Sequence, residues 1–143
     1  MTEIKILLVE DNEGDIILTQ EALTDAKIKN KVSVVRDGEE AINFLDNAAS
    51  NGGVGLPQLI LLDINLPKID GKEVLQYIKT TPALKKIPVV MLTTSSSELD
   101  IVDSYNHHAN CFITKPVDLN KFFEVVKMIE DFWITIVKLP SND

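Results

Sequence analysis

The sequence has little of what would place this protein outside a reducing compartment or in a membrane. Its 143 residues include a single cysteine, Cys111, so no disulfide can form within the chain. No apolar run has the length of a membrane-spanning helix. The first five residues lack a signal-peptide pattern, because a strand-like run begins almost at once. We therefore expect a cytoplasmic protein with no membrane partner.

Basic residues are also in deficit. The chain has 14 Lys and Arg against 22 Asp and Glu, which gives a net charge of -8. The phosphates of a nucleic acid would repel such a surface, so we expect no nucleic-acid partner. The excess acid suits a site for a divalent cation, although most of it is expected at the solvated surface.

Linkers, repeats and low-complexity tracts are missing too, so the length predicts one domain over residues 1–143. Its core is expected over about residues 4–137, followed by a short C-terminal tail. What the sequence does contain is a regular alternation of short apolar runs and helix-like segments. The predicted strands are 4–9, 32–35, 59–62, 89–92 and 111–114. The predicted helices are 14–26, 39–47, 71–80, 98–106 and 118–137.

This alternation predicts an α/β fold, a doubly wound five-stranded parallel sheet with five helices on its two faces. The common strand order for such a sheet is 2-1-3-4-5. In the first helix, we expect Ile17, Leu18, Ala22 and Leu23 to form the buried side.

Polar residues of reactive types follow the apolar strands. Asp11, preceded by Glu10, follows the first strand, and Asp63 follows the third. Thr93 and Lys115 follow the fourth and fifth. Ligands bind at the carboxyl ends of strands in such sheets, so these side chains are predicted to share one cleft. An alternative stays open for Glu10 and Asp11, which could merely cap the first helix, as Asn12 could.

Three carboxylates in one cleft would repel one another, and a hard divalent cation would relieve the repulsion. All-oxygen ligands favour magnesium, manganese or calcium over zinc. A carboxylate is also a competent nucleophile toward phosphorus and would form an acyl phosphate. The cation could then neutralise one phosphoryl oxygen and Lys115 another, while the Thr93 hydroxyl and nearby backbone N–H groups bind the third.

At these residues the sequence resembles the receiver domains of two-component signalling, which have a flavodoxin-like fold. The resemblance covers about residues 4–137. The matching stretches are Leu8-Val9-Glu10-Asp11-Asn12, Leu62-Asp63-Ile64-Asn65-Leu66-Pro67-Lys68-Ile69-Asp70-Gly71, Pro88-Val89-Val90-Met91-Leu92-Thr93-Thr94 and Phe112-Ile113-Thr114-Lys115-Pro116.

The resemblance implies a role for each matching position. Asp63 is implied as the phosphoacceptor, with Thr93 and Lys115 assisting the transfer. The implied Mg²⁺ ligands are Glu10, Asp11, Asp63 and the backbone carbonyl of Asn65. The implied switch residues are Thr93 and Phe112, and the implied cis proline is Pro116.

Two positions depart from the family pattern. Glu10 stands where many receivers have aspartate, so it could reach the metal through water. Phe112 stands where many have tyrosine, so it has no hydroxyl to donate a hydrogen bond.

Looser motifs are similar to those of the stand-alone regulators paired with phytochrome-type histidine kinases. These motifs are the glycines of 51–55, Ser95-Ser96-Ser97-Glu98, Ala109-Asn110-Cys111 and the tail from Phe132-Trp133 to Pro140. They imply a sensor histidine kinase and an unknown downstream protein as partners. Apolar residues in excess of one face of the last helix favour a homodimer through the fourth and fifth helices. The implied function is therefore that of a phosphoacceptor signalling domain, which is not a turnover enzyme. The alternative is a small magnesium-dependent phosphatase with an aspartate nucleophile.

Overall fold

The structure, a computed structural model, describes residues 3–25, 29–93, 111–114, 120 and 124. The elements in chain order are β1 (Ile4–Val9), α1 (Glu13–Asp25), β2 (Asn30–Val35), α2 (Gly38–Ser50), β3 (Leu59–Asp63), α3 (Gly71–Thr80), β4 (Val89–Thr93) and β5 (Cys111–Thr114). They confirm the predicted alternation. The predicted fourth helix lies outside the described residues. Of the predicted fifth helix only Asn120 and Glu124 are described, and both are helical.

The five strands form one parallel sheet in the order β2-β1-β3-β4-β5, as predicted. Because the strands are parallel, their carboxyl ends lie at one edge of the sheet. The order reverses between β1 and β3, since β2 lies on one side of β1 and the later strands lie on the other. Ligand sites in open α/β sheets form at such a reversal.

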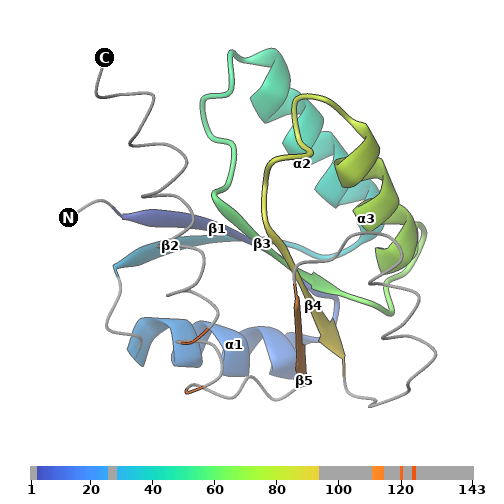
Figure 1. Cartoon of the computed structure of the whole chain (residues 1–143). Helices are drawn as coiled ribbons and strands as arrows, with labels where there is room; N and C mark the ends of the chain where they lie inside the picture. Colours follow the sequence, from blue (N-terminus) through green and yellow to red (C-terminus); the bar gives the residue numbers. More distant parts are fainter. Residues whose placement is uncertain (1–2, 26–28, 94–110, 115–119, 121–123, 125–143) are drawn as a thin grey trace.

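Helices cover both faces of the sheet. Figure 1 shows α1 on one face and α2 with α3 on the other. Alternate side chains of the strands point to opposite faces, so they join two separate cores. Leu7 and Ile60 pack in the core beneath α2 and α3, whereas Leu8 and Leu61 pack in the core beneath α1. Every residue of β3 is buried, which explains the uninterrupted apolar run of its first four residues, 59–62.

The predicted buried side of α1 is wrong in part. Ile17 and Leu18 are 47% and 49% exposed, and the buried residues are Ile16, Thr19 and Leu23. Steps of three and four residues place these three on one side of a helix. Thr19 is polar, so a search for apolar residues alone did not identify this side of the helix as the buried one.

Short polar side chains lie at the starts of α1, α2 and α3. The Asn12 side chain accepts a hydrogen bond from the Asp15 N–H (2.9 Å) ahead of α1. Asp37 accepts one from the Glu40 N–H (2.8 Å) at α2, and Asp70 caps α3. Such caps satisfy N–H groups that have no partner within the helix. None of the helices in the described part of the chain has the length and apolar character needed to cross a bilayer.

Candidate functional site

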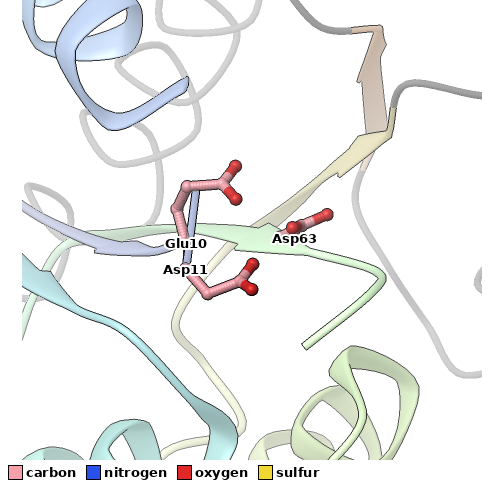
Figure 2. A group of neighbouring side chains, drawn as sticks. All are labelled: Glu10, Asp11 and Asp63. Carbon is pink, nitrogen blue, oxygen red and sulfur yellow. The ribbon is translucent and has the colours of Figure 1, made fainter. Parts of the chain in front are cut away.

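Three carboxyl groups meet at the carboxyl edge of the sheet. Glu10, Asp11 and Asp63 each offer an oxygen atom, and these three atoms lie within 4.8 Å of one another. Figure 2 shows the three side chains together at the carboxyl ends of β1 and β3. Glu10 is fully buried and Asp63 is 4% exposed, whereas Asp11 is exposed. The cluster is therefore set into the protein and open on the side of Asp11.

The register of the sheet brings these residues together. Val9 is the partner of Leu62 across β1 and β3, so the next residues, Glu10 and Asp63, reach the same level. Adjacent strands are about 4.8 Å apart, which sets the spacing of the carboxyl groups. The sequence predicted that the strand ends would bring these three acids together, and the geometry confirms that they meet.

Backbone N–H groups orient two of the carboxylates. Glu10 Oε2 accepts a hydrogen bond from the Asn12 N–H (3.2 Å), and Asp63 Oδ1 accepts one from the Asn65 N–H (3.3 Å). Asn12 also supplies the side-chain cap of α1. Of the three residues that the sequence left open as caps of the first helix, Asn12 therefore provides a side-chain cap.

Of the other predicted site residues, three lie in the described part of the chain and two do not. Thr93 ends β4, one residue beyond Leu92, which is the partner of Asp63 across β3 and β4. Phe112 belongs to β5, where its partner is Met91. Asn65 is the second residue after β3. Lys115 and Pro116 lie outside the described residues.

The carboxyl cluster fits a hard divalent cation. Its donors are oxygen atoms only, which suits magnesium, manganese or calcium. Three carboxylates this close repel one another when all are ionised, and a bound cation offsets that repulsion. Both the donor chemistry and the spacing therefore match the cation that the sequence predicts.

One pair beside the cluster was not found from the sequence. Lys68 Nζ lies 3.7 Å from Asp37 Oδ2, which joins the loop after β3 to the start of α2. The Glu40 backbone N–H lowers the pKa of Asp37 most, and the Lys68 charge lowers it further, while partial burial opposes both effects. In the sequence, Asp37 lies between the second predicted strand, 32–35, and the second predicted helix, 39–47, and no local pattern links it to Lys68.

Comparison with known proteins agrees with this geometry. The sequence matches the family described as the response regulator receiver domain over residues 6–127. Response regulator Rcp1 of Synechocystis sp. is 48% identical over 136 residues, which cover 95% of this chain and 92% of that protein.

Two solved structures are also similar. The phosphorylated cyanobacterial phytochrome response regulator RcpA is 51% identical, with a TM-score of 0.74 over 93% of this chain and 95% of RcpA. The Mn²⁺-bound form of Rcp1 is 47% identical, with a TM-score of 0.72 over 93% of this chain and 96% of Rcp1. The family match, the fold and the acidic cluster at the strand ends agree, and this chain belongs to the receiver domain family of two-component response regulators.

Proposed function

We propose that Asp63 accepts a phosphoryl group from a sensor histidine kinase and that Mg²⁺ assists the transfer. The single observation that carries this proposal is the meeting of the Glu10, Asp11 and Asp63 oxygens within 4.8 Å. As a receiver domain, the chain is a signalling protein and not a turnover enzyme.

In the proposed step, an Asp63 carboxylate oxygen attacks the phosphorus of a phosphohistidine. The new O–P bond forms as the N–P bond breaks, and the kinase imidazole leaves and takes up a proton. The result is an acyl phosphate on Asp63 and a free histidine on the kinase. The Asn65 N–H, which donates to Asp63 Oδ1, holds the carboxyl group in position.

Mg²⁺ would be held by Glu10, Asp11, Asp63 and the Asn65 carbonyl, and it supplies positive charge that stabilises the phosphoryl oxygens. Glu10 is longer than aspartate by one methylene group and would act directly or through a water molecule. Of the two acids from the end of β1, Asp11 is the exposed one, so it is the better placed to meet an arriving cation.

Lys115 would neutralise a second phosphoryl oxygen, and the Thr93 hydroxyl would move to bind a third. Phe112 would follow Thr93, since the two belong to neighbouring strands of the sheet. Pro116 would follow a cis peptide bond that fixes the direction of Lys115. The added charge on Asp63 would thus alter how a surface of the domain binds other proteins.

The relatives support the proposed kinase partner. RcpA is described as a cyanobacterial phytochrome response regulator, which supports a phytochrome-type histidine kinase as the phosphoryl donor for this chain. A downstream protein would read the phosphorylated state in the cytoplasm. A homodimer through the fourth and fifth helices stays a prediction, because those helices lie outside the described residues apart from Asn120 and Glu124.

The test is phosphorylation with acetyl phosphate and Mg²⁺, followed by mass spectrometry of the intact protein. We expect one added phosphoryl group, which Asp63→Asn abolishes and the matched control Asp25→Asn, at the exposed end of α1, retains. Omission of the divalent cation should also prevent the modification. Phosphorylation that persists in Asp63→Asn would refute this site.

The phosphatase alternative predicts something different. A phosphatase would release phosphate from many small phosphomonoesters with repeated turnover, whereas a receiver would not. The family match and the relatives do not support the phosphatase.

A further inference from the structure

Loop 64–70 holds the carboxyl group of Asp63. The Asn65 N–H, near its start, donates to Asp63 Oδ1 (3.3 Å). At its end, the Gly71 N–H donates to the Ile64 carbonyl (3.1 Å). A side chain on Gly71 would begin 2.1 Å from the Asp63 carbonyl oxygen, so this end of the loop is closed tightly against β3. Both ends of the loop therefore contact Asp63 or its neighbour Ile64.

The middle of the loop is attached to the start of α2. Lys68 Nζ lies 3.7 Å from Asp37 Oδ2, and Asp37 is only 8% exposed. The next residue of the loop, Ile69, packs against Gly38, where a Cβ atom would meet the Ile69 carbonyl oxygen at 2.1 Å. These two adjacent contacts fix the loop to a helix start that is itself capped.

Lys68 has an unusual backbone conformation. Its φ is 66°, in the left-handed region that residues other than glycine rarely adopt. Such a conformation persists where the surroundings stabilise it. Asp37 is a suitable partner, because its oxygen Oδ1 accepts from the Glu40 N–H (2.8 Å) while Oδ2 faces Lys68.

We propose that Lys68 is a positioning residue for the cation site: its ion pair with Asp37 holds loop 64–70 so that Asn65 keeps the Asp63 carboxyl turned toward Glu10 and Asp11. This inference rests on the proposed function, because it assumes that the three carboxylates bind a divalent cation. It adds a residue that carries no ligand atom and has the same charge as the cation.

The sign of the charge makes the inference testable. If Lys68 acted only as a nearby positive charge, its removal would tighten cation binding, because like charges repel. If it acts by position, its removal weakens cation binding. Lys68→Met should therefore bind Mn²⁺ about two- to fivefold more weakly than the wild type, which is the range of a partly exposed ion pair.

The experiment is a Mn²⁺ titration followed by electron paramagnetic resonance on the full chain. Lys68→Arg should restore wild-type affinity, because it keeps the charge and can still reach Asp37. In about 1 M KCl, where the screening length falls to about 3 Å, the difference between Lys68→Met and the wild type should shrink. Thermal unfolding without metal checks that each variant is folded.

Arg36→Met is the matched control. Arg36 Nη1 lies 2.6 Å from Glu13 Oε2, so this ion pair joins the start of α2 to α1 and not to loop 64–70. We expect its removal to leave Mn²⁺ binding unchanged or tighter.

Unchanged or tighter binding in Lys68→Met overturns the positioning role, as does equal weakening in Lys68→Arg or in Arg36→Met. The outcome for the proposed function is separate. A wild-type chain that bound no divalent cation would refute the cation site itself, whatever the variants do.

Discussion

At the scale of single residues, Asp11 is the most accessible member of the carboxyl cluster, and its proposed role in metal binding can be tested apart from its effect on stability. It lies close to two other carboxylates, so without metal its charge is expected to destabilise the fold. We predict that Asp11→Asn binds Mg²⁺ at least tenfold more weakly, since even outer partners of metal ligands contribute about 10–100-fold. Unfolding by urea in the presence of a chelator should show no loss of stability.

Isothermal titration with Mg²⁺ gives the affinity, and Asp25→Asn on the outside of α1 is the control for loss of one negative charge. Equal affinity in Asp11→Asn and the wild type would contradict the prediction. A large loss of metal-free stability would instead assign Asp11 a structural role.

Gly71 is the residue whose lack of a side chain matters most for the site. A Cβ at this position would lie 2.1 Å from the Asp63 carbonyl oxygen and 2.8 Å from that of Ile64, and backbone cannot move aside easily. We predict that Gly71→Ala lowers the free energy of unfolding by roughly 1–3 kcal/mol, as overpacking typically does. Chemical denaturation measures this.

Gly14→Ala is the comparison for Gly71→Ala. Its Cβ would meet the Asn12 side-chain oxygen at 3.3 Å, a contact that a small shift can relieve. Gly14 also lies in α1, where alanine is favoured. We expect little change in stability, and equal losses in the two variants would contradict this explanation of Gly71.

At the scale of elements, α2 and α3 lie side by side on one face of the sheet and are joined by a hydrogen bond between side chains. The Tyr77 hydroxyl of α3 donates to Asp46 Oδ1 of α2 at 2.6 Å. This bond raises the pKa of Tyr77 above its ordinary value of 10.0, and desolvation and the Asp46 charge raise it further. The pair therefore links the helix that carries Asp37 to the helix that follows loop 64–70.

We predict that Tyr77→Phe lowers stability by about 0.5–1.5 kcal/mol at neutral pH, the usual net value of one hydrogen bond. Because the folded pKa of Tyr77 is raised, the stabilisation is fully present below pH 10 and is lost as the pH rises through the folded value. Urea unfolding of both proteins at neutral and alkaline pH measures the difference. A difference that grew above pH 10 would have the wrong sign.

At the scale of the whole molecule, the proposed cation binding would couple the carboxyl edge to the stability of the fold. A ligand that binds only the folded state stabilises it by about 2.7 kcal/mol at a hundred times its Kd. We predict that Mg²⁺ at such a concentration raises the unfolding midpoint by several degrees, at about 2–4 °C per kcal/mol. Calorimetry of the wild type should show this shift, and Asp11→Asn at the same Mg²⁺ concentration should show much less.

Much of the fold could be predicted because its signals are local. The run 59–62 is apolar throughout and belongs to β3, which is buried on both faces. The sequence could therefore predict both that this run is a strand and that it lies inside the sheet. The predicted third helix, 71–80, has the bounds of α3, because a capping carboxylate, Asp70, directly precedes it and is a local signal for a helix start. The buried side of α1 was misjudged, since Thr19 is polar and yet faces the core.

The sequence by itself determined the alternation of strands and helices, and with it the edge where Glu10, Asp11 and Asp63 would meet. It could do so because the period of apolar residues and the direction of parallel strands fix where strand ends lie. Only the tertiary structure decided that Lys68 forms an ion pair with Asp37 and that Ile69 packs against Gly38. Those contacts depend on how loop 64–70 and the start of α2 pack together in space. Residues that far apart in the sequence leave no local pattern that predicts their contact.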